Sequence, residues 1–147
     1  MTKKSCFLIL FFFAFTSVSH GLEKEEVLAF ADHLEKCTPY KGEFTHPFNG
    51  QKMQREIVGI IDGKCLYTEE MPNNGKMTCK HHIEQLPVIA QHYRDIITAK
   101  SSTVSAKIKF HGEEQEVKTT YTINGKEVKS PMQECLNNGT CVISGYE

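Results

Sequence analysis

Tight-turn signals are the feature that most limits how this chain of 147 residues can fold. Asn49-Gly50, Asp62-Gly63 and Asn73-Asn74-Gly75 follow one another at short intervals, and Asn124-Gly125 comes later. Asn, Asp and Gly adopt the positive φ angles that short hairpin loops require. A loop this short joins only antiparallel neighbours, because parallel strands need a long crossover connection. The pattern therefore predicts an antiparallel sheet.

The segments between these turns are rich in the β-branched and aromatic residues that are typical of strands. Strands are predicted within residues 44–80 and again after residue 101, and a last small hairpin is predicted around Asn137-Asn138-Gly139. The clearest strand segments are residues 57–61, 65–68, 104–110, 116–123 and 126–128.

Two segments have the periodicity of amphipathic helices. In residues 22–36, Val27, Phe30 and Leu34 recur at helical spacing, and residues 84–99 repeat the pattern with Pro87 in the first turn, where proline is tolerated. The order of elements is therefore helix, antiparallel strands, helix, antiparallel strands. This order predicts an α+β domain, with an antiparallel sheet and two amphipathic helices packed on one of its faces.

The first 21 residues have the three parts of a secretory signal peptide. Lys3 and Lys4 precede an unbroken apolar run over residues 6–15, and small residues follow. The apolar run is shorter than the ~20 residues that a membrane-spanning helix needs. We therefore predict a signal peptide over residues 1–21, cleaved after Ser19 or Gly21.

Residues 22–147 are predicted to form a single domain with no membrane span. The whole chain has 17 Lys and Arg against 18 Asp and Glu, and removal of residues 1–21 takes away two lysines and no acid. The remainder is therefore mildly negative, whereas a nucleic-acid binder carries a basic face. The charge balance argues against nucleic acid as a partner.

The cysteines fit an oxidising compartment, where disulfides form and persist. The chain has six, and all but Cys6 follow the predicted signal peptide. That leaves an odd number, so at least one thiol is free or pairs with another chain. The cysteines of the predicted domain are Cys37, Cys65, Cys79, Cys135 and Cys141.

Turn chemistry suggests how these cysteines pair. A three-residue loop at Asn137-Asn138-Gly139 would place Cys135 directly opposite Cys141, near disulfide distance. We therefore predict a Cys135–Cys141 bond. Cys37 ends the first predicted helix and is expected to pair with Cys65 or Cys79, which leaves both alternatives open.

The segment Cys79-Lys80-His81-His82, with His92 further along, contains the side chains that bind zinc and copper. Cys79, His81, His82 and His92 are therefore candidate metal ligands. Strand geometry sends His81 and His82 to opposite faces, which weighs against both binding one ion. The alternative is a polar strand end with Cys79 in a disulfide.

No sequence signature of a hydrolase, of a Cys-x-x-Cys redox pair or of a phosphate-binding loop is present. No catalytic residue and no organic cofactor is therefore assigned. The odd cysteine could serve as a nucleophile beside a histidine, or it could be a buried structural residue.

Several short segments resemble small exported bacterial proteins of uncharacterised function. The resemblance covers about a third of the chain, and it implies a periplasmic location and a framework of three cysteines, to which this chain adds Cys135 and Cys141. The segments that carry it are Cys37-Thr38-Pro39-Tyr40, Ile57-Val58-Gly59, Gly63-Lys64-Cys65-Leu66-Tyr67 and residues 71–79.

Three roles fit these observations. The leading hypothesis is an exported, non-catalytic binding or accessory module of the cell envelope or secreted fraction, whose partner is a protein, a peptide or an envelope component. The first alternative is a periplasmic protein that binds zinc or copper, and the second is a thiol-based enzyme. All three place the chain in the periplasm or outside the cell.

The signal-peptide hypothesis predicts the N-terminus of the exported protein. We expect its intact mass to correspond to a chain that begins at His20 or Leu22, because the small residues that a signal peptidase requires precede those two positions. Mass spectrometry of the exported protein measures this directly. An exported form that retains residues 1–21 would contradict the hypothesis.

Overall fold

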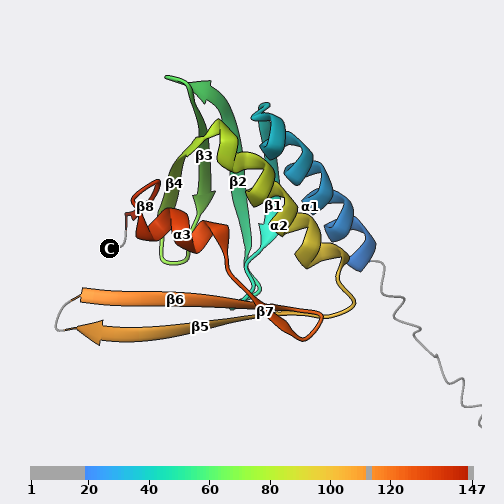
Figure 1. Ribbon diagram of the computed structural model, residues 1–147, viewed down its shortest axis with the longest axis vertical. Helices are drawn as coiled ribbons and strands as arrows, with labels where there is room; N and C mark the ends of the chain where they lie inside the picture. Colours follow the sequence, from blue (N-terminus) through green and yellow to red (C-terminus); the bar gives the residue numbers. More distant parts are fainter. Residues whose placement is uncertain (1–18, 112–113, 146–147) are drawn as a thin grey trace, which may run out of the picture.

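The computed structural model describes residues 19–111 and 114–145, which form two antiparallel sheets and three α-helices (Figure 1). The elements, in chain order, are α1 (Ser19–Lys36), β1 (Tyr40–Thr45), β2 (Lys52–Ile61), β3 (Lys64–Glu70), β4 (Lys76–His82), the 3-10 turn η1 (Ile83–Gln85), α2 (Leu86–Thr98), β5 (Ser102–His111), β6 (Glu114–Ile123), β7 (Lys126–Val128), α3 (Pro131–Asn137) and β8 (Cys141–Ser144).

The larger sheet has the strand order β1-β2-β3-β4-β8, and every neighbouring pair is antiparallel. Asp62 and Gly63 both have positive φ and form a two-residue loop between β2 and β3. The loop from β3 to β4 spans residues 71–75, and Asn73 and Asn74 have positive φ within it. The antiparallel arrangement that the turn signals predict is confirmed.

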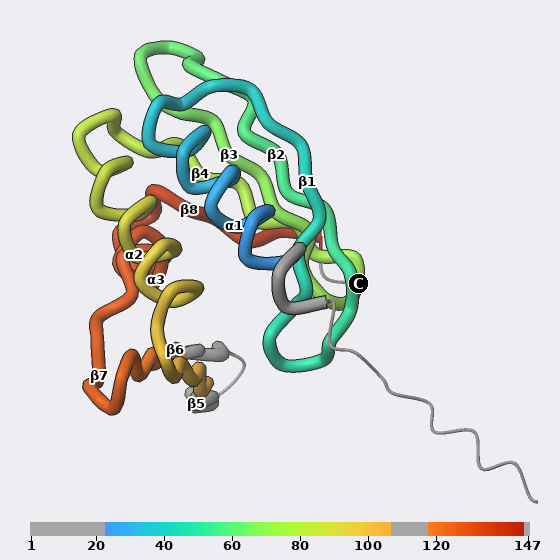
Figure 2. The backbone as a smooth tube through the Cα atoms, turned by 90° about the vertical axis from the view of Figure 1, so that its right-hand side faces the viewer, coloured from blue at the N-terminus to red at the C-terminus, as the bar shows by residue number. Residues whose placement is uncertain are grey.

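The helices α1, α2 and α3 lie on the same face of this sheet (Figure 2). Helices α1 and α2 contact each other, and Arg94 of α2 binds Asp32 and Glu35 of α1 at 2.8 and 2.5 Å. The predicted α+β class and both predicted helices are confirmed. The core between helices and sheet is built from Phe30, Leu34, Cys37, Ile57, Cys65, Tyr67, Met77, Cys79, Leu86, Ile89, Cys135 and Cys141.

The later strands do not extend the first sheet. They form a separate sheet with the order β5-β6-β7, while β8 pairs with β4 at the edge of the first sheet. This second sheet contacts the helical layer: the ring of Tyr121 meets His92 of α2 at a centroid distance of 4.9 Å, and the Thr119 N–H donates to Gln133 of α3. The hairpins were predicted, but their separation into a second sheet was not.

The predicted hairpin around residues 137–139 is wrong. Ser130 caps a helix by accepting a hydrogen bond from the Gln133 N–H, and Pro131 occupies the first turn, where its missing N–H is harmless. The segment that was expected to be the first arm of the hairpin is therefore α3. Gly139, with φ of +79°, follows the helix and lies in the left-handed region that favours glycine.

The predicted Cys135–Cys141 bond is wrong for the same reason. Cys141 lies directly opposite Cys79 in the β4–β8 ladder, with a Cα–Cα distance of 4.0 Å, and the two form a disulfide. Cys37 is bonded to Cys65, one of the two partners predicted for it, and this bond ties the end of α1 to β3. Cys135 is a free, buried thiol.

Helix α1 begins at Ser19, within the predicted signal peptide, while residues 1–18 lie outside the described part. The predicted cleavage is therefore not tested. Across residues 19–111 and 114–145, no helix combines the length and hydropathy that crossing a bilayer requires.

The packing of α1 against the sheet predicts the effect of truncating its central side chain. Phe30 is fully buried against Tyr67 and Tyr93, so Phe30→Ala is expected to lower the free energy of unfolding by about 3–5 kcal/mol. Urea denaturation measures the loss. The control Val88→Ala, at a position that is 63% exposed, should change stability by less than about 0.5 kcal/mol. Similar losses in the two variants would contradict the prediction.

Candidate functional site

Strand β4 presents two of the predicted metal ligands to the core. Side chains alternate between the two faces of a strand, and β4 buries Met77, Cys79 and His81 while Lys80 and His82 are exposed. His81 has no exposed surface. Histidine is not among the residues that are most often fully buried, so the atoms around this imidazole are of interest.

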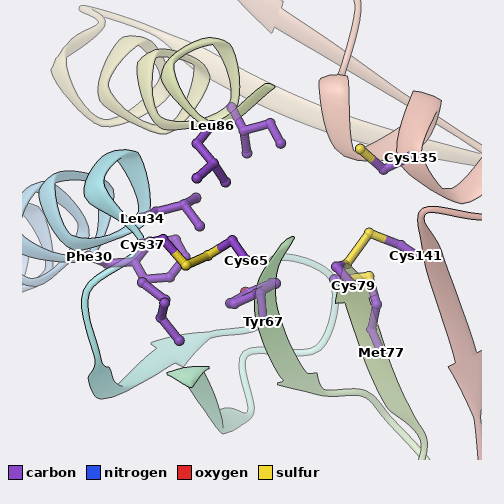
Figure 3. Close-up of a cluster of buried hydrophobic side chains, with 12 residues drawn as sticks. Phe30, Leu34, Cys37, Cys65, Tyr67, Met77, Cys79, Leu86, Cys135 and Cys141 are labelled. Carbon is purple, nitrogen blue, oxygen red and sulfur yellow. A yellow bond between two sulfur atoms is a disulfide. The ribbon is translucent and has the colours of Figure 1, made fainter. Parts of the chain in front are cut away.

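Three sulfur atoms surround this imidazole. Cys135 of α3 places its Sγ 3.7 Å from His81 Nδ1. The sulfurs of Cys79 and Cys141 and one ring nitrogen of His81 lie within 4.8 Å of one another. Figure 3 shows the bond from Cys79 to Cys141, with Cys135 on the adjacent helix. We refer to Cys79, His81, Cys135 and Cys141 as the sulfur–imidazole cluster.

Burial keeps the titratable members of this cluster neutral. It lowers the pKa of His81 to about 4, and it raises the pKa of the Cys135 thiol, to which the charge of Glu134 adds. The Nε2 atom of His81 is buried and has no hydrogen-bond partner among the described residues. At pH 7 the pair is therefore a thiol and a neutral imidazole, and it does not provide the thiolate that a cysteine nucleophile needs.

The other two predicted metal ligands lie elsewhere. His82 is on the outer side of β4, with its Nδ1 4.0 Å from a carboxylate oxygen of Glu84. His92 is on α2 and packs against Tyr121. The structure thus brings Cys79 and His81 together and does not bring His82 or His92 to them. Sequence reasoning missed Cys141 and Cys135 as their neighbours, because a non-local strand pairing and a short helix position them.

A second polar group lies in the core, under α1. Arg55 is 4% exposed, its guanidinium carbon is 3.7 Å from the centroid of the Phe30 ring, and its Nε and Nη2 have no partner in the described segments. Glu69 is directly opposite Arg55 on β3 and accepts a hydrogen bond from the Tyr67 hydroxyl. Burial raises the pKa of Glu69, an effect that its hydrogen bond to Tyr67 and the nearby charge of Arg55 oppose. The ring of Phe30 stabilises the buried cation, so this group supports the fold.

Exposed aliphatic side chains gather at one end of the larger sheet. Val58, Ile60 and Ile61 on β2 are 39%, 61% and 46% exposed, and Ile83, which follows β4, is 41% exposed. Ile61 pairs with Lys64, and Lys64 pairs with His82, so these residues lie near the ends of three adjacent strands. Ile60 pairs with Cys65, so the consecutive side chains of Ile60 and Ile61 leave opposite faces of the sheet at its end. We refer to Val58, Ile60, Ile61 and Ile83 as the aliphatic patch.

Two surface hollows lie away from the sulfur–imidazole cluster. One lies between α2 and the segment from β6 to α3, and its lining includes Val88, His92, Ile123 and Glu134. The other lies over the start of β2 and the loop between β3 and β4, and its lining is mainly polar. Neither of these hollows reaches a cysteine of the cluster, which fits the burial of all four of its side chains.

Comparison with known proteins assigns neither a family nor a function to this chain. The chain matches no family model, no curated protein and no solved structure.

The buried imidazole predicts how stability depends on pH. An unfolded histidine has a pKa near 6.5 and folded His81 has one of about 4, so the unfolded chain takes up a proton that the folded chain does not. The contribution of His81 is complete above pH 6.5, and it is lost as the pH falls from 6.5 towards 4. We expect the free energy of unfolding to fall by about 3 kcal/mol from this residue.

Urea denaturation at several pH values measures this loss. His82→Gln should retain it, because His82 is on the exposed face of β4, whereas His81→Gln should remove most of it. Burial also lowers the pKa of His92, so some pH dependence should persist in His81→Gln. The same pH dependence in both variants would contradict the assignment to His81.

Proposed function

We propose that this chain is exported and acts as a non-catalytic binding module, which docks an apolar surface of another envelope or secreted protein onto the aliphatic patch. The observation that carries the proposal is the exposure of Val58, Ile60, Ile61 and Ile83 near the ends of adjacent strands. Scattered exposed aliphatic residues are normal on any protein, but a group of them at one place is typical of an interaction site.

The patch stands on a rigid part of the fold, which favours binding. Ile60 pairs with Cys65, and the bond from Cys65 to Cys37 ties this end of the sheet to α1. The loop between β2 and β3 contains only Asp62 and Gly63. Side chains that are already held in place lose little entropy when a partner binds, so more of the contact energy is retained as affinity.

The export part of the proposal is supported by the disulfides and by the N-terminal sequence. Two disulfides link Cys37 to Cys65 and Cys79 to Cys141, and such bonds persist in oxidising compartments. The basic residues and apolar run of the first 21 positions are typical of a secretory signal. Periplasmic and fully secreted locations both agree with these features.

The binding role is favoured over a thiol-based enzyme on electrostatic grounds. The best nucleophile candidate, Cys135, is 3% exposed, and burial raises the pKa of its thiol. A catalytic cysteine requires the opposite, namely an accessible sulfur with a lowered pKa.

Photo-crosslinking in the organism that makes the protein tests the proposed surface. A photoreactive amino acid at position 60 is expected to give a discrete crosslinked product, because that side chain is the most exposed member of the patch. The matched control is position 142, where an aliphatic side chain on β8 is 57% exposed outside the patch, and we expect no such product there.

A second substitution tests whether the patch itself binds. Replacing Ile61 and Ile83 by Ser should abolish the crosslink from position 60 while the purified protein keeps its thermal stability, because both side chains are exposed. The absence of any product at position 60, or the same products from positions 60 and 142, would contradict the proposed docking surface.

A further inference from the structure

The sulfur–imidazole cluster contains the side-chain types of a common donor set for a soft metal ion. Three cysteines and one histidine form a common donor set of structural zinc sites. Here β4 contributes Cys79 and His81, β8 contributes Cys141, and α3 contributes Cys135. All four side chains are buried, so an ion among them would be shielded from water.

Three of the donors, Cys79, His81 and Cys141, lie within 4.8 Å of one another, and Cys135 lies beside the imidazole. Zinc binds sulfur at about 2.3 Å and imidazole nitrogen at about 2.0 Å, so two such ligands in a tetrahedral site are about 3.6 Å apart. The distance between Cys135 Sγ and His81 Nδ1 is 3.7 Å. The sulfurs of Cys79 and Cys141 lie within 4.8 Å of a ring nitrogen of the same histidine.

The histidine gives a second, independent reason to expect a ligand. His81 is fully buried, its Nδ1 meets a thiol, and its Nε2 has no partner in the described ranges. A buried polar atom without a hydrogen bond carries a desolvation penalty that hydrophobic packing does not offset. A metal ion bound at Nε2 would remove this penalty, whereas an ion bound at Nδ1 would replace the contact with Cys135.

The Cys79–Cys141 disulfide determines whether these two sulfurs can bind a metal ion. In the Cys79–Cys141 bond neither sulfur is a thiolate, so the oxidised chain offers the ion only Cys135 and His81. A dithiol or phosphine reductant that supplies two electrons and two protons converts the bond into two thiols. Zinc can then bind three sulfurs and one nitrogen, and the thiol protons are released to solvent.

We propose that Cys79, His81, Cys135 and Cys141 form a zinc site that opens when the Cys79–Cys141 disulfide is reduced. The oxidised chain then has a covalent link between β4 and β8, and the reduced chain replaces it with an ion that also holds α3. Entry to the buried site is eased by the same step, because β8 pairs with β4 over only four residue positions once the bond is broken. This site is separate from the aliphatic patch and does not depend on the proposed docking role.

Titration with Co²⁺, a spectroscopic substitute for zinc, tests the proposal on the exported form of the chain. After reduction with a phosphine and anaerobic removal of the reductant, Co²⁺ should give the visible bands of a tetrahedral site and a thiolate charge-transfer band, at one ion per chain. Zinc should displace the cobalt and raise the melting temperature of the reduced protein. The oxidised protein should give none of these signals.

Matched variants identify the ligands. His81→Gln and Cys135→Ser should lose or shift the cobalt bands, whereas His82→Gln, one residue along the same strand on the exposed face, should keep them. Far-UV circular dichroism of the oxidised variants checks that each is folded. Because the reductant also breaks the bond between Cys37 and Cys65, a variant with Ser at both positions should still bind cobalt.

Two outcomes would overturn the proposal. The first is a reduced, folded wild-type chain without cobalt bands, or bands that persist in both His81→Gln and Cys135→Ser. The second is a peptide map in which Cys135 becomes bonded to Cys141 and no cobalt is bound. That result would assign the cluster to thiol–disulfide exchange.

Discussion

The burial of one face of β3 and β4 is the constraint on which the rest of the structure depends. Because side chains alternate along a strand, Cys65 and Tyr67 on β3 and Cys79 and His81 on β4 all face the same side. The helices α1, α2 and α3 cover that side, and both disulfides begin from it. The same alternation that builds the core therefore also brings the histidine and the sulfurs together.

The local parts of this fold can be predicted from sequence because single residues determine them. Asp62-Gly63 and Asn124-Gly125 form the expected two-residue loops, since few other residues accept positive φ at adjacent positions. Helix α3 was missed although Ser130 and Pro131 carry the signal of a helix start, because Asn137-Asn138-Gly139 equally suits a hairpin loop or the end of a helix. The separation of β5, β6 and β7 into a second sheet depends on long-range strand pairing, which no local signal reports.

The candidate site likewise has one part that local sequence signals predict and another that depends on long-range contacts. The alternation of side chains along β4 depends only on the local sequence, so it predicts Cys79 and His81 on one face and His82 on the other. The approach of Cys141 and Cys135 depends on a pairing between segments that are 62 residues apart and on the packing of α3, so sequence reasoning assigned these two cysteines to each other. The aliphatic patch could not be predicted from the sequence either, because buried Ile57 and exposed Ile60 belong to the same run of strand-forming residues.

The position of β8 has a consequence for how the molecule matures. Until β8 is in place, β4 has an unsatisfied ladder of backbone donors and acceptors, and such a ladder invites pairing with the same strand of another molecule. The strand that occupies this position has only four residues and comes last among the described elements. The covalent bond between Cys79 and Cys141 joins it to its own chain, which disfavours exchange of this strand between two copies.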